Sequence, residues 1–226
     1  MFSNFRYHYL HWRYAKRSQK TGVKSLYNTP FPPQSQKIIN TKFTVVDCEM
    51  SGLNPRENEL LSIGWTTIKN GKIVNSESGQ VLIHSNEGSG ESIKIHGLSD
   101  RDLANAVSLP SALSRLIAKL QNTIVVFHFA PIDLAFLQKA SMQCFQCPLI
   151  FPYFDTLQIE KKRLALQGKS GGLRLHECRS RYNLDDSAQH NAMADAHATA
   201  ELFIAQLHYS GDLENLQLSH LPFNCA

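Results

Sequence analysis

Two acidic residues, spaced two apart, interrupt an apolar run that would otherwise be an ordinary buried strand. Asp47 and Glu49 follow Val45 and Val46 in the run Phe-Thr-Val-Val-Asp-Cys-Glu. Side chains alternate along a strand with a period of two, so the two carboxylates point to the same face. A carboxylate beside buried valines is costly unless a cation compensates its charge. The run therefore predicts a strand that carries a cation site on one face.

Two more acidic residues lie far along the chain. Pro131 suits the first turn of a helix, so Asp133 is expected near the N-terminus of that helix. Asp195 lies in an alanine-rich run that is expected to form the last long helix, five residues after His190. Several carboxylates together with a histidine are typical of a divalent-metal phosphodiesterase site.

The order and spacing of these acidic segments carry a family resemblance. The matching residues are Asp47-x-Glu49 followed by Ser51-Gly52-Leu53, Asp133 followed by Phe136-Leu137, and His190-x4-Asp195-Ala196. Together they resemble the motifs of the DEDDh 3′–5′ exonucleases, which include the proofreading ε subunit of bacterial DNA polymerase III and ribonuclease T. The segment 95–100 is also similar to a segment of the ε family. The resemblance covers residues 41–208.

The resemblance implies both a fold and a metal site. The implied fold is α/β and ribonuclease H-like, a mixed five-stranded sheet flanked by helices. The implied ligands of two Mg²⁺ or Mn²⁺ ions are Asp47, Glu49, Asp133 and Asp195. His190 is the implied general base, because an unperturbed imidazole titrates near about 6.5 and can take a proton from water.

The turn after the first acidic pair is the implied contact for the 3′-terminal nucleotide. Its residues are Met50, Ser51, Gly52 and Leu53, and the alternative is an ordinary turn at a strand exit. His96 and His128 lie in motif-like segments and are further candidates for substrate contact. Phe129 stands where the family usually has Asn, and is expected to be either a core residue or a stacking surface.

Strand-like and helix-like runs alternate through the central part of the chain. The expected strands are 43–49, 60–69, 72–74, 79–83 and 124–129, and the expected helices are 110–120, 155–166, 173–179 and 190–208, with one more that begins near residue 131. Three strand-like runs followed by alternating helices and strands favour an α/β or α+β sandwich.

The chain divides into a basic aromatic arm with a Pro-rich linker (1–40), an exonuclease domain (41–210) and a tail (211–226). Residues 1–24 hold six Lys or Arg residues and no acid, and Phe5, Tyr9 and Trp12 recur at helical spacing. The arm is expected to bind nucleic acid or a partner, or to pack its aromatic stripe on the domain. Its composition also resembles that of a transit peptide.

Two shorter patterns carry hypotheses of their own. The tail segment 217–223 resembles peptides that dock on bacterial sliding clamps, and the alternative is that its apolar side chains fold back on the domain. Cys144 and Cys147, with His176 and Cys178, are either a zinc site or part of a loop packed on the body.

Composition limits the possible functions. Outside residues 1–24 the chain has 17 basic and 19 acidic residues, so this part would hold a polyanion through metal and local contacts. The odd count of five cysteines favours a reducing cytoplasmic setting. No run approaches the roughly 20 apolar residues that a membrane helix needs.

We therefore expect a metal-dependent 3′–5′ exonuclease that acts on single-stranded DNA ends in proofreading or repair. A DNA polymerase or a sliding clamp would be its protein partner. One alternative is an RNA-trimming exonuclease similar to oligoribonuclease or ribonuclease T. Another is a non-catalytic binding subunit of a polymerase, which the intact set of acids and His190 argues against.

Overall fold

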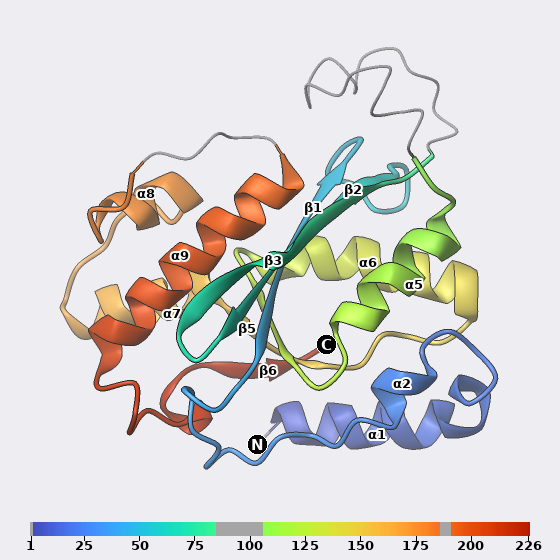
Figure 1. The fold of residues 1–226 in the computed structure, drawn as a ribbon, viewed down its shortest axis with the longest axis horizontal. Helices are drawn as coiled ribbons and strands as arrows, with labels where there is room; N and C mark the ends of the chain where they lie inside the picture. Colours follow the sequence, from blue (N-terminus) through green and yellow to red (C-terminus); the bar gives the residue numbers. More distant parts are fainter. Residues whose placement is uncertain (1, 85–105, 186–190) are drawn as a thin grey trace.

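The computed structural model describes residues 2–84, 106–185 and 191–226, and its centre is one mixed sheet (Figure 1). The strands are β1 Phe43–Met50, β2 Leu60–Lys69, β3 Lys72–Leu82, β4 Ile124–Phe127, β5 Pro152–Asp155 and β6 Phe223–Cys225. Their order across the sheet is β3-β2-β1-β4-β5-β6. The first three strands form an antiparallel meander, β4 and β5 run parallel to β1, and β6 is antiparallel to β5.

The α/β, ribonuclease H-like class is confirmed, but the sheet has six strands rather than five. Neither β5 nor β6 was among the strands expected from the sequence, and in β6 Phe223 pairs with Phe154 of β5. The two short strands expected at 72–74 and 79–83 are one continuous strand, β3, with an irregularity between the pairs Trp65–Gly79 and Thr67–Val74.

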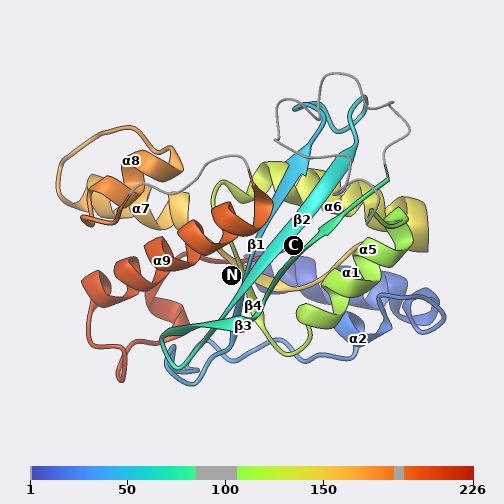
Figure 2. The same ribbon diagram turned by 45° about the horizontal axis from the view of Figure 1, so that its top comes forward.

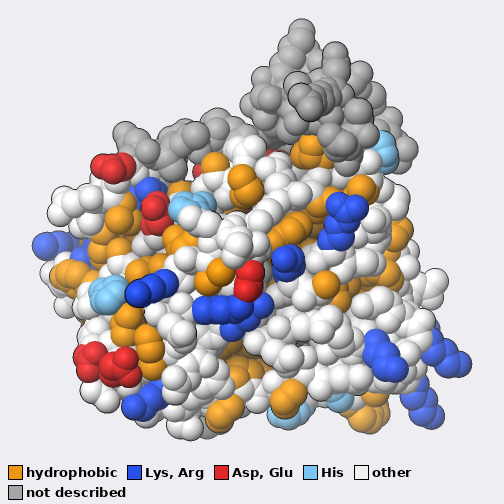
Figure 3. Space-filling view, in the orientation of Figure 1, with side chains coloured by type: hydrophobic (Ala, Val, Ile, Leu, Met, Phe, Trp, Pro, Cys, Tyr) orange, Lys and Arg blue, Asp and Glu red, His pale blue; other side chains and the backbone are white. Residues whose placement is uncertain are grey.

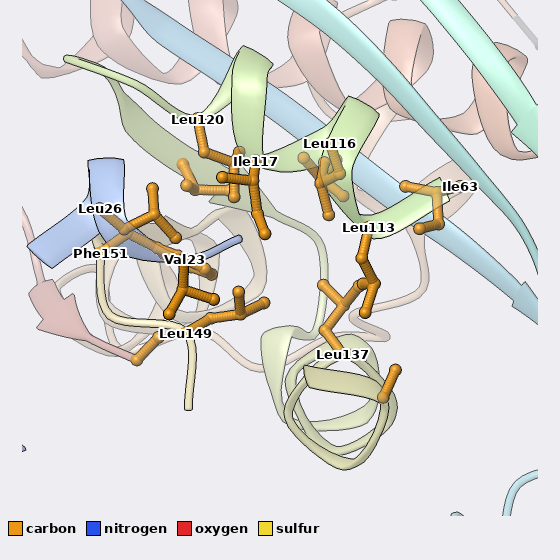
Figure 4. Close-up of a cluster of buried hydrophobic side chains, with 14 of the residues drawn as sticks. Val23, Leu26, Ile63, Leu113, Leu116, Ile117, Leu120, Leu137, Leu149 and Phe151 are labelled. Carbon is orange, nitrogen blue, oxygen red and sulfur yellow. The ribbon is translucent and has the colours of Figure 1, made fainter. Parts of the chain in front are cut away.

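Helices cover both faces of the sheet (Figure 1 and Figure 2). They are α1 Phe2–Ser18, α2 Lys24–Tyr27, α5 Leu109–Lys119, α6 Ala130–Phe145, α7 Thr156–Leu166, α8 Leu175–Ser180 and α9 Ala192–Ser210. On one face, side chains of α1, α2, α5 and α6 pack on the sheet, and Figure 4 shows Leu113, Leu116 and Leu137 within this layer. On the other face, α7 and α9 pack through Ile159 and Phe203.

Strand β1 has a different neighbour on each face. Val46 and Cys48 belong to the core under α5 and α6, whereas Val45 faces the core under α9. Because side chains alternate along a strand, Asp47 and Glu49 lie on the α9 face. The strand therefore ends with its two acids on one face, as the sequence predicted, and that face is the one covered by α9.

The N-terminal helix packs on the domain, but not through the stripe that its sequence suggested. Tyr7 is buried, and Leu10 and Tyr14 pack beside it on the same core. The predicted stripe of Phe5, Tyr9 and Trp12 is exposed. The helix is therefore docked through one face and presents aromatic rings on the other.

The segment 217–223 is part of the core. Leu218 and Leu221 are buried in the layer under α9, and Phe223 lies in β6 with its ring 5.5 Å from that of Phe31. The apolar anchors of the expected clamp peptide are thus occupied within the domain. The clamp hypothesis requires a free segment, and the structure shows a packed one.

All five cysteines are free thiols. Among the described residues, none of the helices has the length and apolar character required to span a membrane. The cytoplasmic location stays a prediction from cysteine usage.

Candidate metal and nucleic-acid site

Three carboxylates converge at the end of β1. Oxygen atoms of Asp47, Glu49 and Asp195 all lie within 4.8 Å of one another, and each residue is partly exposed. We call these three residues the acidic cluster. Asp47 and Glu49 come from one face of β1, and Asp195 lies in the first turn of α9. This separation of oxygens fits a divalent cation held by oxygen ligands.

A cap and a glycine fix the start of α9 against the sheet. The side-chain oxygen of Asn191 accepts hydrogen bonds from the backbone N–H groups of Met193 and Ala194, which are free at a helix N-terminus. Gly64 lies opposite Asp47 in β2. A Cβ atom at Gly64 would lie 2.2 Å from the backbone carbon and oxygen of Ala192. Only glycine allows this approach, which places Asp195 beside Asp47.

Asp133 reaches the same strand end from the opposite layer. Its side chain, 3% exposed, extends from the first turn of α6, and its Oδ1 accepts a hydrogen bond from the backbone N–H of Cys48 at 3.0 Å. It is not one of the three mutually close carboxylates. Its assignment as a metal ligand stays a prediction, and its hydrogen bond to Cys48, the residue between the two acids of β1 in the sequence, supports it.

The carboxylates destabilise one another in their charged form. Burial, followed by the charges of Asp133, Asp195 and Glu49, raises the pKa of Asp47 well above its usual range. Burial also raises the pKa of Asp133, to about 7, against the opposing effect of its hydrogen bonds. A bound cation would reverse both effects, because it stabilises the deprotonated form of each acid. The residues present therefore fit a divalent metal.

Asp155 organises the turn that leads to Asp133, and the sequence prediction did not include it. Its Oδ1 accepts from the N–H groups of Phe129 and Leu157, and its Oδ2 accepts from that of Ala130. These bonds cap α7 and hold Phe129 in a left-handed conformation, with φ 68° and ψ 54°. The available signal was an Asp-Thr pair at the end of an apolar run, which is a common N-cap.

The turn after β1 folds back on itself. The Oγ of Ser51 accepts from the N–H of Glu59 at 2.9 Å, and a Cβ atom at Gly52 would lie 2.5 Å from Oδ1 of Asn58. Met50, the last residue of β1, packs partly on the core. Leu53 is 79% exposed. The turn is thus compact and presents one apolar side chain beside the strand end that carries the acids.

Both ring nitrogens of His128 lie at hydrogen-bonding distance from other atoms of the protein. Its Nδ1 lies 2.8 Å from Oγ1 of Thr156, and its Nε2 lies 3.0 Å from the carbonyl oxygen of Leu173. Burial lowers its pKa. The two contacts tie α7 and the 168–174 loop to the end of β4, and direct substrate contact through His128 stays a prediction.

The neighbouring Phe129 follows β4, the parallel neighbour of β1 in the sheet. Its side chain is 48% exposed, which favours the stacking-surface alternative over the core. The ends of parallel strands meet at one edge of a sheet. Phe129 and Leu53 therefore lie after the same ends of neighbouring strands.

Two predicted residues, His190 and His96, lie outside the described residues. Within the described residues, the acidic cluster is the one group of three or more His, Cys, Asp or Glu side chains close enough to hold a metal ion. Cys144, Cys147, His176 and Cys178 do not form such a group there. The loop alternative for these cysteines is thus favoured over zinc.

The sequence is similar to proteins of one exonuclease family. A model of the exonuclease family RNase_T matches residues 44–203. A PolC-type DNA polymerase III of Thermotoga petrophila is 32% identical over 165 residues, which are 73% of this chain and 12% of the relative. A PolC-type DNA polymerase III of Staphylococcus aureus is 22% identical over 87% of this chain and 14% of the relative. The chain thus spans about one eighth of the length of these relatives.

Solved structures share the fold at low sequence identity. E. coli exonuclease I in complex with a dT13 oligonucleotide has a TM-score of 0.61 at 13% identity and covers 74% of this chain and 41% of that one. Cell-death related nuclease 4 has a TM-score of 0.60 at 14% identity and covers 76% of this chain and 65% of that one.

Proposed function

The chain belongs to the exonuclease family, and on that premise we propose that it is a metal-dependent 3′–5′ exonuclease that removes nucleotides from single-stranded DNA ends. The observation that carries the proposal is the acidic cluster, whose carboxylate oxygens lie within 4.8 Å of one another. The raised pKa of Asp47 shows that the cluster is unfavourable when charged and uncompensated. Such a group is expected where a cation is part of the functional state.

The acidic cluster would hold the cations, and Asp133 would add a fourth carboxylate. Oxygen ligands suit Mg²⁺ or Mn²⁺. Two such ions supply charge neutralisation at both the attacking and the leaving oxygen of a phosphodiester. Gly64 and Asn191 position Asp195, and Asp155 positions the turn before Asp133.

The remaining roles belong to proton transfer and substrate orientation. His190 would accept the proton of the attacking water, as its motif implies. Leu53 and Phe129, both exposed at the ends of neighbouring parallel strands, would contact the terminal base from two sides. Base stacking on an aromatic ring tolerates any sequence, which suits an exonuclease.

DNA is the favoured substrate because the sequence relatives are DNA polymerases and a structural neighbour was solved with an oligonucleotide of thymidine. We further propose that the chain acts with a DNA polymerase. RNA trimming is the alternative, because the 2′-OH is read by pocket shape.

The test uses matched single-stranded DNA and RNA oligonucleotides, labelled at either end, with Mg²⁺ or Mn²⁺ added to metal-free protein. A 5′-labelled DNA should give a ladder, and a 3′-labelled DNA should release its label in the first step. Asp195→Asn should abolish hydrolysis, whereas Glu214→Gln, an exposed acid on the segment after α9, should not. Wild-type turnover by Asp195→Asn would refute the site, and preferential cleavage of RNA would replace the DNA assignment with the alternative.

A further inference from the structure

We propose that the outward face of α1 binds the upstream part of a single-stranded nucleic acid whose 3′ end lies at the acidic cluster. This inference rests on the proposed function, and it adds a second contact surface to it. The surface consists of the rings of Phe5, Tyr9 and Trp12 with the side chains of Arg13 and Lys16, and it is flanked by Arg6 and Arg17. We call it the α1 face.

The α1 face exposes three large rings in one row. Phe5, Tyr9 and Trp12 are 74%, 47% and 75% exposed. Their spacing of four and then three residues places them on one side of the helix, opposite the buried Tyr7. The rings of Tyr9 and Trp12 are 6.4 Å apart and tilted by 41°, so they are not stacked on each other. Single exposed apolar side chains are ordinary, but a row of aromatic rings marks an interaction surface.

The charge of this face is complementary to phosphate. Arg6, Arg13, Lys16 and Arg17 are exposed, and residues 1–24 contain no acid. Figure 3 shows Lys and Arg side chains gathered at the lower right, where the end of α1 lies in Figure 1. Residues 1–24 are therefore a purely basic segment, whereas in the rest of the chain the acids slightly outnumber the bases, so the arm attracts a polyanion. Aromatic rings beside cations are the two components of a single-strand binding surface.

The helix presents this face from a fixed position. The hydroxyl of Tyr7 donates to the carbonyl oxygen of Thr29 at 2.7 Å, and Nε2 of His11 lies 2.6 Å from the carbonyl oxygen of Tyr27. The ring of Tyr7 also contacts that of Phe31 at 4.9 Å. A ligand on the outer face would therefore not have to order the helix, which reduces the cost of binding.

A lipid surface fits these residues less well. An interfacial helix inserts a continuous apolar face into the membrane and keeps its cations on the opposite side. Here Lys16 continues the row of Phe5, Tyr9 and Trp12, and the apolar side of the helix is packed on the domain. Aromatic rings and cations lie together on one exposed side of the helix. This arrangement suits a single-stranded nucleic acid, whose bases can stack on the rings while its phosphates contact the cations.

The distance between the two surfaces sets the substrate length that can reach both. Asp133, in the first turn of α6, accepts a hydrogen bond from Cys48 beside the acidic cluster, and the C-cap of the same helix, Gln146, accepts one from Arg17 of α1. The 13 residues between these positions rise about 20 Å along the helix. A strand with the 3.4 Å base spacing of a duplex strand needs about six nucleotides for that distance. A trinucleotide, which spans about 10 Å, is therefore too short to reach from the acidic cluster to the α1 face, whereas a strand of about 20 nucleotides exceeds this distance about threefold.

The experiment compares substrates of about three and about 20 nucleotides on the full chain. Trp12→Ala should raise the KM for the long substrate by about fivefold or more, as expected for one lost stack, with kcat unchanged. The same variant should leave the kinetics of the trinucleotide unchanged. Leu166→Ala is the matched control, because Leu166 is equally exposed but lies on α7. An unchanged KM for the long substrate would overturn the proposal.

A charge variant and a binding assay complete the test. Arg13→Gln/Lys16→Gln should lower the slope of log KM against log salt by about 1.4 for the long substrate. Fluorescence anisotropy of a labelled strand with metal-free protein should show the same loss of affinity in Trp12→Ala. If Trp12→Ala binds the strand as tightly as the wild type in that assay, the proposal for the α1 face is overturned. The binding assay does not depend on hydrolysis, so a wild type that hydrolyses nothing would refute only the proposed function. If the wild-type protein sediments with anionic vesicles and Trp12→Ala does not, while both bind the nucleic acid equally well, the α1 face would be assigned to lipid.

Discussion

Gly64→Ala tests how closely α9 must approach the sheet. The new Cβ would lie 2.2 Å from the backbone carbon and oxygen of Ala192 and 2.4 Å from the nitrogen of Met193. Ordinary contact begins at 3.4 Å, so the first turn of α9 must withdraw by about 1 Å. Backbone atoms cannot rotate away as a flexible side chain can. Asp195, one turn further along, would move with them.

A displacement of about 1 Å in a catalytic constellation costs on the order of 10²-fold in rate, or about 2.7 kcal/mol. We therefore expect kcat/KM to fall about 100-fold and the affinity for Mg²⁺ to weaken, as measured by steady-state kinetics and calorimetry. Overpacking should also lower the free energy of unfolding by about 1–3 kcal/mol.

Gly79→Ala is the matched control, because Gly79 lies in the neighbouring strand and its new Cβ would meet only the side chain of Trp65, at 3.0 Å. It should lose stability without a comparable loss of activity. A folded Gly64→Ala protein with wild-type kcat/KM and metal affinity would refute the argument that this glycine positions Asp195.

Three further predictions concern other parts of the domain. Burial raises the pKa of Asp133 from its usual 3.8 to about 7. Between these two pH values the folded metal-free protein binds more protons than the unfolded chain, so its stability should fall as pH rises toward 7. Thermal melts in chelator at pH 5 and 8 should show this fall, which Asp133→Asn should reduce; identical melts at both values would contradict it. Asp155→Ala removes three hydrogen bonds to a carboxylate and should lower the free energy of unfolding by about 3 kcal/mol or more, with a lower kcat; a denaturant midpoint equal to that of the wild type would show that these caps are dispensable. Leu218→Ala should destabilise by about 2–5 kcal/mol, as expected for a core position, whereas a free clamp-binding tail would lose almost nothing.

The sequence predicted features whose signals are local. The bounds of β2 were correct because Asn70-Gly71 is a hairpin turn, and both residues have positive φ. The common face of Asp47 and Glu49 followed from the period of a strand alone. The position of Asp195 near the start of α9 followed from an alanine-rich run with family-like spacing.

The features that were missed depend on partners far along the chain. Strand β6 has only three residues, and its pairing with β5 carries no local signal. The role of Gly64 requires α9, which begins 128 residues later. The hydrogen bonds of His128 had no local signal, because its partners, Thr156 and Leu173, are 28 and 45 residues away. In each case a short pattern is ambiguous until the tertiary neighbour is known.

The left-handed backbone of Phe129 affects which residues are favourable at this position in related exonucleases. With φ at 68°, the residue occupies a conformation that Gly and Asn adopt readily and that costs other residues about 1–2 kcal/mol. Related exonucleases with Asn at this position would therefore have a relaxed turn, and this chain has a strained one with an exposed ring. Phe129→Asn should raise the melting temperature while it weakens substrate binding. At this one position, a residue that relaxes the turn would increase the stability of the fold, and a residue with an aromatic ring would increase the affinity for the substrate. A single substitution would therefore raise one of these two properties and lower the other.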